Sequence, residues 1–353
     1  MEYMSVLETP EVYDFWCALW AIGVGVGRDV YVDRPNSPVY LNWYIILAAE
    51  AGTTRKSTAI SSISTIVGGT SPLLTGKTSP EGLEILLHER TRKEGTARAT
   101  FAVSELVTIL GREGYMSTMP GLLTDLYDSP AERYVPGTIK SGELIHKNVY
   151  ITFISASTPT WLVTAINPSV IEGGFTSRVI FVVEDRRKRA IAWPKERDPS
   201  SLRCIIRSYE ETTEAGRGIG AIQISEGGLK KFTKWYNNRD AHQDPFQSSF
   251  EAREDDHVLR AAACLAINDG ILELQDRHIS HGIKIIAEAK DRANKLFGSG
   301  FNTRARMAGA VGRVREILIE AGSDGIKHSD LQRRVVRHID AKELRVLIDI
   351  MHE

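Results

Sequence analysis

The chain has 353 residues, which is enough for one large domain or about two to three smaller ones with a sizeable buried core. Its 44 lysines and arginines nearly balance its 45 aspartates and glutamates, so no overall basic field could hold nucleic acid, and any such contact must come from a local patch. The three cysteines, Cys17, Cys204 and Cys264, form no C-x-x-C pair, which argues against a zinc site and a disulfide framework. We therefore expect a cytoplasmic protein.

The first predicted element is a helix over residues 10–27. Thr9-Pro10-Glu11 supplies a helix start signal, and apolar residues follow at helical spacing. The most apolar stretch, residues 15–26, is too short to span a bilayer and lacks a signal-peptide cleavage pattern. We predict a buried helix within an N-terminal helical cap, residues 1–34, and no membrane partner.

A strand, a loop and a helix follow. Residues 42–49 form a continuous apolar run of strand length, and a helix is predicted over residues 57–66. The loop between them matches the phosphate-binding pattern G-x-x-x-x-G-K-S/T only at Lys56-Ser57, because Glu50 and Arg55 replace its two glycines. We expect Arg55 to adopt a backbone conformation that is less demanding of glycine than usual. An ordinary strand-to-helix turn is the alternative.

Three further buried strands are predicted after this unit, and helical patterns separate them. The strands are at residues 99–103, 149–155 and 179–183, and the helices are at 80–92, 105–111 and 118–127. Strands that alternate with helices favour a mainly parallel, three-layer α/β sheet. We place this core at residues 35–190.

The strand at 99–103, which is the second of the core after the one at 42–49, could supply an acid. An ATPase needs acidic groups for magnesium and for the attacking water at the end of a strand near its phosphate loop. Ser104 stands where the first acid is expected, and Glu105 is the candidate that polarises water. The alternative is a helix N-cap followed by a first-turn acid. If Glu105 does not act on water, Asp125 and Asp128 are the next candidates.

Two later segments could contact a nucleotide. After the third strand, Ser157 and Thr158 could sense a γ-phosphate, although they equally fit a capped helix start. Before the fourth strand, a glycine-rich turn leads to Arg178. In ring ATPases an arginine at this place offsets transition-state charge on the neighbouring subunit's nucleotide, while the alternative is a surface arginine.

The sequence changes character after residue 184, where a charged run and two prolines indicate a linker near residue 190. A helical lid is predicted over residues 191–300, with helices at 202–214, 226–239, 250–268 and 277–297. Residues 301–353 carry helical patterns at 308–321, 328–337 and 340–352. These resemble a helix-turn-helix of the winged-helix kind that ends where a wing would begin.

The order of these motifs resembles the P-loop ATPase domain of phage, plasmid and mobile-element replication proteins. That domain is a P-loop NTPase core of the RecA/AAA+ type, related to hexameric replicative helicases and their primase-helicase fusions. The resemblance runs from about residue 10 to residue 286. It is carried by Gly52-Thr-Thr-Arg-Lys-Ser57, Val103-Ser-Glu105, Ser155-Ala-Ser-Thr-Pro159, Gly174-Phe-Thr-Ser-Arg178 and Leu259-Arg-Ala-Ala262.

The resemblance implies an ATP-dependent DNA helicase or translocase motor of a mobile genetic element. ATP and Mg²⁺ would bind between subunits of a homo-oligomeric, hexamer-like ring, with single-stranded DNA in its pore. Lys56 would bind the β- and γ-phosphates, Glu105 the attacking water, and Arg178 the neighbour's γ-phosphate. The cofactor-binding residues would be Gly52, Thr53, Thr54, Arg55, Lys56, Ser57, Thr58, Ser157, Thr158 and Arg260. The magnesium ligands would be Ser57, Ser104 and Glu105. Arg260 could equally pair with Asp255 or Asp256.

Two segments could contact DNA. Residues 132–147 alternate around glycine and could form a hairpin, placed where related helicases insert a pore hairpin; Arg133, Lys140 and Lys147 would then meet phosphates. The basic helix at 328–337 could place Arg333 and Arg334 on DNA. A solvated surface hairpin and a module for protein contacts are the alternatives.

Two other functions remain open at this stage. The replaced glycines and the replaced acid favour a DNA-binding or assembly module that binds nucleotide without hydrolysing it. An ATPase switch that acts on protein partners is the third possibility, and it predicts turnover without stimulation by DNA.

Overall fold

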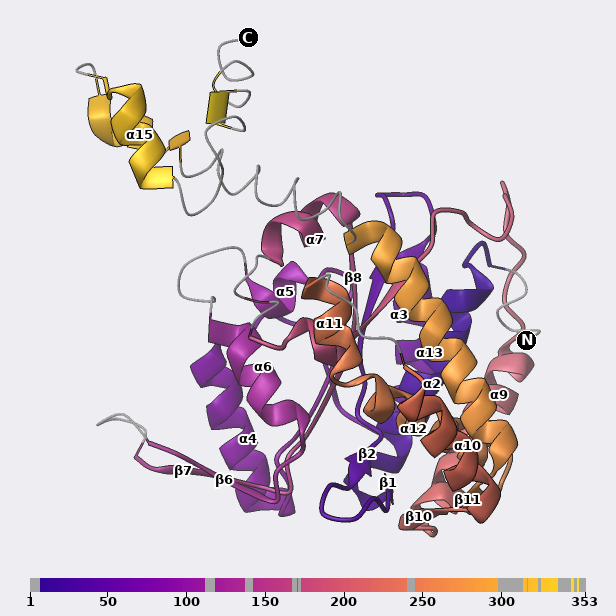
Figure 1. The fold of residues 1–353 in the computed structure, drawn as a ribbon. Coiled ribbons are helices and arrows are strands. Elements are labelled where there is room, and N and C mark those ends of the chain that lie inside the picture. Colours follow the sequence, from indigo (N-terminus) through magenta and orange to yellow (C-terminus); the bar gives the residue numbers. More distant parts are fainter. Residues whose placement is uncertain are drawn as a thin grey trace.

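Five parallel strands form the central sheet of the computed structural model, in the order β4-β5-β8-β3-β9 (Figure 1). They are β3 (Tyr44–Ala48), β4 (Leu73–Leu74), β5 (Arg98–Val103), β8 (Tyr150–Ser157) and β9 (Val179–Val183). The structure describes residues 7–111, 118–136, 142–166, 170, 173–239 and 245–297 and, further on, 314–315, 317–322, 325–335, 344–345 and 348. The predicted parallel α/β sheet is confirmed.

Helices cover both faces of this sheet. Side chains of β3 alternate between two cores, with Ile45 and Leu47 in one and Tyr44 and Ile46 in the other. The first core includes α2 (Glu11–Val26), α3 (Lys56–Val67), α9 (Pro199–Arg217) and α12 (Glu254–Asn268). The second includes α4 (Pro80–Glu94), α5 (Val107–Leu110), α6 (Met119–Tyr127) and α7 (Pro159–Ala165). Burial on both faces explains why the strands are continuously apolar.

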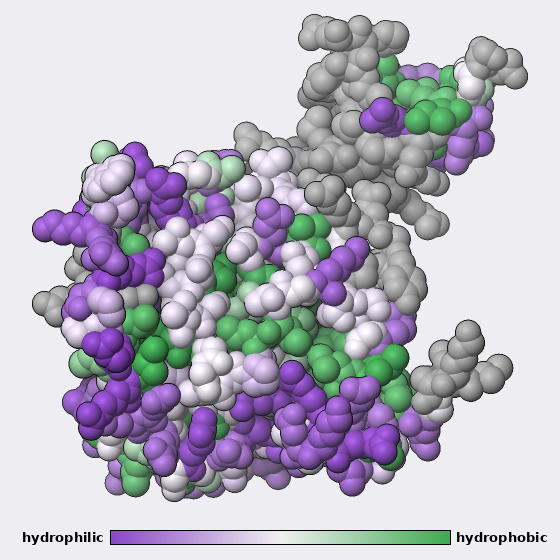
Figure 2. Space-filling model, turned by 180° about the vertical axis from the view of Figure 1, so that it is seen from behind, coloured by the Kyte–Doolittle hydropathy of each residue, from purple (hydrophilic) through white to green (hydrophobic). Residues whose placement is uncertain are grey.

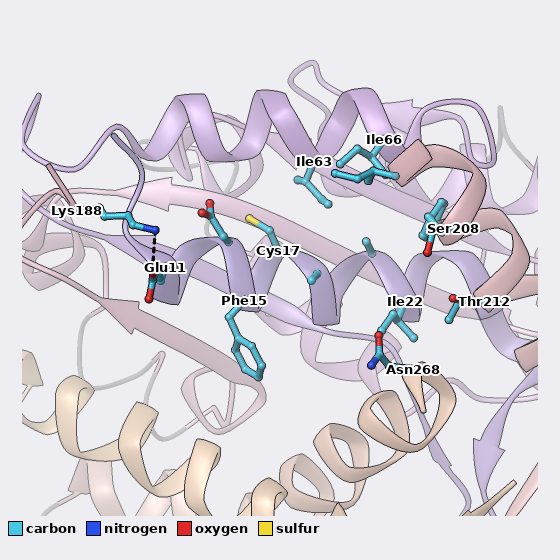
Figure 3. A pocket seen from close by; sticks show the side chains of 15 residues that line it. Glu11, Phe15, Cys17, Ile22, Ile63, Ile66, Lys188, Ser208, Thr212 and Asn268 are labelled. Carbon is cyan, nitrogen blue, oxygen red and sulfur yellow. Dashed lines mark ion pairs between the residues drawn. The ribbon is translucent and has the colours of Figure 1, made fainter. Parts of the chain in front are cut away.

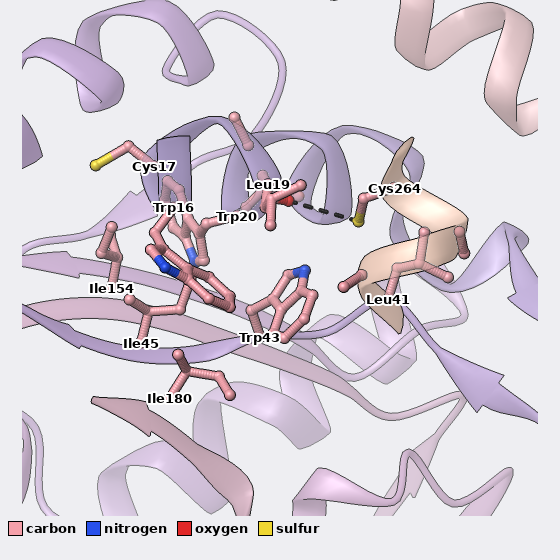
Figure 4. Packing of buried hydrophobic residues seen from close by; sticks show 14 of the residues in the cluster. Trp16, Cys17, Leu19, Trp20, Leu41, Trp43, Ile45, Ile154, Ile180 and Cys264 are labelled. Atoms are coloured by element: carbon pink, nitrogen blue, oxygen red, sulfur yellow. Dashed lines mark hydrogen bonds between the residues drawn. The ribbon is translucent and has the colours of Figure 1, made fainter. Parts of the chain in front are cut away.

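Helix α2 is fixed to the sheet by large aromatic side chains. Trp16 of α2 and Trp43, which precedes β3, meet edge to face with ring centroids 5.6 Å apart (Figure 4). Trp20 is also fully buried in this cluster. Truncating such a tryptophan to alanine typically costs about 3–5 kcal/mol of stability, so this helix is part of the core.

A second, smaller sheet joins the predicted N-terminal cap to the predicted lid. Its order is β11-β10-β1-β2, and it consists of β1 (Tyr31–Val32), β2 (Val39–Tyr40), β10 (Ala221–Ile224) and β11 (Glu273–Leu274). Strands β1 and β10 pair in parallel. The sequence analysis did not predict these strands because two to four residues are too few to show a period.

The remaining lid helices are close to those predicted, with one break. They are α10 (Glu226–Asn237), α11 (Pro245–Glu251) and α13 (Asp276–Phe297). The single helix predicted at 250–268 is divided, because Arg253 leaves the helical region with φ −128° and ψ 5° before α12 begins. The Arg253 side chain pairs with Asp128 and Asp256.

Near the C-terminus, helix α15 (His328–Val335) matches the middle helix predicted for the helix-turn-helix. A small separate core joins it to residues on either side, namely Val314, Ile317, Leu331, Val335 and Leu344. Much of the first and third predicted helices lies outside the described residues. The helix-turn-helix therefore stays a prediction.

The surface seen from behind mixes hydrophobic and hydrophilic side chains. Hydrophobic side chains gather across its middle, and hydrophilic ones are concentrated below them (Figure 2). None of the described helices combines the length and the apolar character that crossing a membrane requires.

Candidate functional site

The loop between β3 and α3 lies at the carboxyl edge of the central sheet, and Arg55 is its last residue. Arg55 has φ 55° and ψ 38°, which is the left-handed region. The expectation that Arg55 would avoid a glycine-like conformation is therefore wrong. This conformation costs a residue with a side chain about 1–2 kcal/mol. The ion pair between Arg55 Nε and Glu8 Oε2, at 2.6 Å, offsets part of that cost.

Glu8 ties the loop to the segment that follows β9. Its carboxylate accepts hydrogen bonds from the Ile191 amide at 2.7 Å and from Arg55, and it pairs with Arg187 at 3.1 Å. These contacts, the Ile191 bond foremost, lower the pKa of Glu8. The carboxylate therefore stays ionised at neutral pH and holds the loop in place. Its role has no signature in the sequence, since the partners are nearly 50 and more than 180 residues away.

Lys56 is the first residue of α3, and its ammonium group turns back over the loop. Nζ donates to the Ala49 carbonyl at 2.6 Å and to the Glu50 carbonyl at 3.1 Å. No carboxylate pairs with it among the described residues. The side chain is half-buried, and burial lowers the pKa of Lys56 against the opposing charge of Glu50. A cation held only by carbonyls can exchange them for an anion at low cost.

The backbone at the start of α3 supports the same chemistry. The first four N–H groups of a helix have no acceptor within the helix. Together with the helix dipole they favour an anion at this end. Ser57 and Thr58 lie in the first turn of α3, at the helix end where a phosphate would bind. Ser57 is exposed there, and Thr58 is half-buried.

Thr54 has a structural role instead. Its side chain is fully buried, and Tyr13 Oη lies 3.3 Å from its hydroxyl while donating to the Ala48 carbonyl at 3.1 Å. Predicting Thr54 as a nucleotide contact is not supported by this placement. Gly52 has φ 74° and is exposed, and Thr53 donates its hydroxyl to Glu50. Tyr13, which anchors the loop, was missed because it lies in α2.

Strand β8 lies next to β3, and its end carries Ser157 and Thr158. Thr158 Oγ1 accepts the amide of Trp161 and caps α7, as the alternative interpretation expected. Ser157 is half-buried beside it, and its hydroxyl donates to the Thr158 carbonyl. Of the two, only Ser157 keeps a hydroxyl that could turn to a nucleotide without uncapping a helix.

Ser104 and Glu105 follow β5, the next strand after β8. Both are exposed, and the N-cap of α5 is Leu106 with no side-chain hydrogen bond, so the ordinary helix-cap alternative is not observed. Two strand spacings, about 10 Å, separate β5 from β3. A nucleotide bound between these strand ends could therefore be reached from both.

A magnesium ion that arrives with a nucleotide needs few protein ligands. No group of three or more histidine, cysteine and acidic side chains that could hold a metal occurs in the part of the chain that the structure describes. Magnesium usually keeps several waters and takes one or two carboxylates plus substrate phosphates. The exposed residues Ser57, Ser104 and Glu105 offer one carboxylate and two hydroxyl groups at the carboxyl edge of the sheet.

Arg178 lies at the opposite, amino edge of the sheet. It ends η3 (Thr176–Arg178) directly before β9, so the length of β3, about 17 Å, separates it from the loop. Its guanidinium donates to the Gly174 carbonyl at 2.9 Å and pairs with Asp128 at 3.3 Å. Asp128, the reserve candidate for positioning water, is thus at this edge too and cannot reach the phosphate loop.

Arg260 is also at the amino edge. It is 3% exposed and donates to the Tyr40 carbonyl at 2.6 Å and to the Tyr127 hydroxyl. Burial is the largest influence on the pKa of Asp256 and raises it. The charge of Arg260 comes next and lowers it, and the net change is downward. This placement does not bring Arg260 to the loop between β3 and α3 of its own chain. Sequence reasoning also missed Arg253, which binds Asp128 at 2.7 Å and 3.0 Å.

The predicted hairpin is present as β6 (Glu132–Val135) and β7 (Leu144–Lys147). It projects away from the core below α4 (Figure 1). Arg133 is paired with Glu84 at 3.0 Å, and Lys147 with Glu132 at 3.6 Å. Lys140 lies outside the described residues.

In α15, the two arginines predicted to contact DNA are exposed. Arg333 pairs with Asp330 at 2.8 Å and Arg334 with Glu320 at 3.6 Å. Each of the four described cations proposed for DNA therefore has an acidic partner. A scan of protein-family models and a search of curated proteins found no match to the chain.

Proposed function

We propose that this chain is a P-loop ATPase that drives a DNA helicase or translocase. The observation that carries the proposal is the position of Lys56. It begins a helix directly after a buried parallel strand, and its ammonium group lies over the loop on two backbone carbonyls. In open α/β sheets, ligands bind at the carboxyl ends of the strands, where this loop lies.

In this proposal Lys56 transfers its hydrogen bonds from Ala49 and Glu50 to the β- and γ-phosphates. The Lys56 and Ser57 amides at the start of α3 would hold the same phosphates, since the Thr58 amide donates to the Arg55 carbonyl at 3.0 Å, and Arg55 fixes the loop through Glu8. Arg55 supplies the left-handed conformation for which the usual pattern uses glycine. Loss of the glycine is therefore compatible with a working loop.

Magnesium, when bound, would neutralise charge that develops on the phosphates. Ser57 would hold it from the helix end, and Ser104 and Glu105 from the end of β5. Glu105 would also orient the attacking water. Of the two residues that directly follow β5, only Glu105 has a carboxylate, because Ser104 stands where the other acid is expected.

Arg178 would act on the nucleotide of a neighbouring subunit. Its distance from its own loop excludes a role in cis, and an arginine at the amino edge can face another molecule. It would have to leave Asp128 to do so. Mixing Arg178→Ala with Lys56→Ala subunits should then restore turnover, because some interfaces combine an intact loop with an intact arginine. No recovery at any ratio in an oligomeric protein contradicts this role.

The DNA partner is supported by the resemblance and by the projecting hairpin. A hairpin that leaves the core at the edge opposite the phosphate loop could line a pore without disturbing the nucleotide. Arg133 and Lys147 would exchange their carboxylate partners for phosphates. Single-stranded DNA in the pore of a ring of copies is the arrangement we propose.

Two observations favour other functions. Ser104 in place of an acid favours a module that binds nucleotide without hydrolysis. The acidic partners of the hairpin cations favour an ATPase switch that acts on proteins.

Measuring ATP turnover with and without single-stranded DNA distinguishes the three functions. The motor predicts turnover that DNA stimulates and that Glu105→Gln reduces by about 100-fold or more, whereas the exposed control Glu94→Gln leaves it unchanged. ATP binding without turnover would identify the non-hydrolysing module. Turnover that is indifferent to DNA would identify the switch.

A further inference from the structure

A cavity of about 450 Å³ lies on the other side of α2 from the sheet. Its walls come from α2, α3 and α9, and none of residues 49–57 lines it. It extends along α2 from Glu11 to Ile22, which is about 16 Å. This size and shape are typical of a small-molecule site, and the site is separate from the phosphate loop.

The middle of the cavity is apolar. Ile63 and Ile66 of α3 face Ile22 and Phe15 of α2 across it (Figure 3). Ala18 and Ala21 of α2 form the floor of the cavity, and their small side chains leave space above it. An apolar ligand body that covers these side chains would remove apolar surface from water, so it is the favoured occupant of this part of the cavity.

The two ends of the cavity differ in charge. Ser208, Thr212 and Asn268 are neutral polar groups at one end, and Glu11 pairs with Lys188 at 2.6 Å at the other (Figure 3). Asp14 lines the cavity beside this pair, and its Oδ1 accepts the Thr9 hydroxyl at 3.0 Å. With Asp14 ionised, the charged end carries one net negative charge.

Asp14 is the group that selects the ligand. It is half-buried, and no ion pair with a lysine or arginine satisfies it among the described residues, because Lys188 is held by Glu11. Burial raises the pKa of Asp14 to about 6. A cationic group beside it would supply the missing partner.

We propose that this cavity binds a small amphipathic amine, with its protonated nitrogen at Asp14 and its apolar chain between α2, α3 and α9. Ser208, Thr212 and Asn268, at the end of the cavity away from Asp14, could accept a neutral polar group at the other end of the ligand. This inference does not depend on the proposed ATPase function.

Three probes of equal chain length test the charge at Asp14: decylamine, decanol and decanoate. Calorimetric titration of the full chain, below the concentrations at which the probes form micelles and above the Asp14 pKa, gives each affinity. We expect decylamine to bind at least about tenfold more tightly than decanol, and decanoate to bind most weakly. Equal affinities for the amine and the alcohol overturn the proposal, as does no binding of decylamine.

Two variants connect the binding to this cavity. Asp14→Asn should reduce decylamine affinity about tenfold, to that of decanol, while decanol is unaffected. Because removing a buried charge should stabilise the fold, weaker binding could not be attributed to unfolding. Ala18→Trp, from an exposed position on the floor, should abolish binding of all three probes. Glu210→Gln removes an exposed carboxylate of α9 that does not line the cavity and should change nothing; unchanged decylamine binding in Asp14→Asn overturns the assignment.

Discussion

The two edges of the central sheet carry similar side chains in opposite settings. At the carboxyl edge, Lys56 is half-buried on backbone carbonyls, and Glu105 is exposed. At the amino edge, Arg260 and Asp256 are buried in a network of charged and aromatic groups. A group on carbonyls or water can bind a ligand at little cost, while one enclosed by partners holds the fold together. The setting, more than the residue type, separates the candidate site from the scaffold.

Two aspartates show the same contrast in their pKa values. Burial raises the pKa of Asp256, but Arg260, Arg34 and Arg253 outweigh it and the net change is downward. Burial also raises the pKa of Asp14, and there the Thr9 hydroxyl and Lys188, which is paired with Glu11, are too weak to reverse it. At neutral pH, the ionised Asp256 therefore stabilises the fold, because arginines surround it. The ionised Asp14 destabilises the fold, because it is partly buried without such a partner.

The largest effect is expected for Arg260→Met. It removes the partner of the Tyr40 carbonyl and the Tyr127 hydroxyl and one of the arginines around Asp256, so we expect the free energy of unfolding to fall by about 3 kcal/mol or more in urea denaturation. Arg207→Met is the control, because Arg207 and its partner Glu211 are both exposed. Its loss should be about 0.5 kcal/mol or less. Equal losses would remove the distinction between the amino edge and the surface.

Asp14→Asn should stabilise the protein in a pH-dependent way. The folded pKa of about 6 lies above the unfolded value of 3.8, so the proton stabilises the fold below about pH 4 and this stabilisation is lost as the pH rises through 6. Allowing for partial exposure, the variant should gain about 1–2 kcal/mol at alkaline pH and nothing near pH 4. Asp198→Asn is the control of opposite sign, because hydrogen bonds from Ser200 and Ser201 lower the pKa of Asp198. If Asp14→Asn gained the same stability at every pH, the raised pKa of Asp14 would be contradicted.

Arg55→Gly and Arg55→Ala form a matched pair at the loop between β3 and α3. Both remove the ion pair with Glu8, but only glycine also removes the cost of the left-handed backbone. The glycine variant should therefore be more stable than the alanine variant by about 1 kcal/mol. Equal stabilities, measured by thermal unfolding, would show that Arg55 is not strained.

Much of the core was predictable because its signals are local. The apolar runs at 42–49 and 149–155 correspond to β3 and β8, and the Lys56-Ser57 pair begins α3 where it was expected. Strand β1 was not predicted because its two residues depend on pairing with β10, far away in the chain.

The site divides in the same way. Lys56 was identified from the pattern around it, whereas Glu8 and Tyr13 support the loop through tertiary contacts that no spacing reveals. The distance between Arg178 and the loop also follows from strand register, since both lie next to β3 but at opposite ends.

The smallest effect on stability is expected for Lys147→Ala in the hairpin. Lys147 and Glu132 are exposed, so the change should cost about 0.5 kcal/mol or less. If the hairpin contacts DNA, the logarithmic salt slope of single-strand binding should become shallower by about 0.7. Lys93→Ala, from an exposed pair on α4, is the control and should leave the slope unchanged. The same slope in both variants would exclude Lys147 from the DNA contact.

The most direct test of the account is the equilibrium binding of ATP with Mg²⁺ to the wild type and to Lys56→Ala, with unfolding measured on the same samples. Losing a charge-assisted contact from a site otherwise built of backbone should weaken binding by about tenfold or more, and the free energy of unfolding should stay nearly unchanged. Lys230→Ala, an exposed lysine of α10, serves as the control and should bind as the wild type does. Equal ATP affinity in the wild type and in Lys56→Ala would contradict a phosphate site at the carboxyl edge.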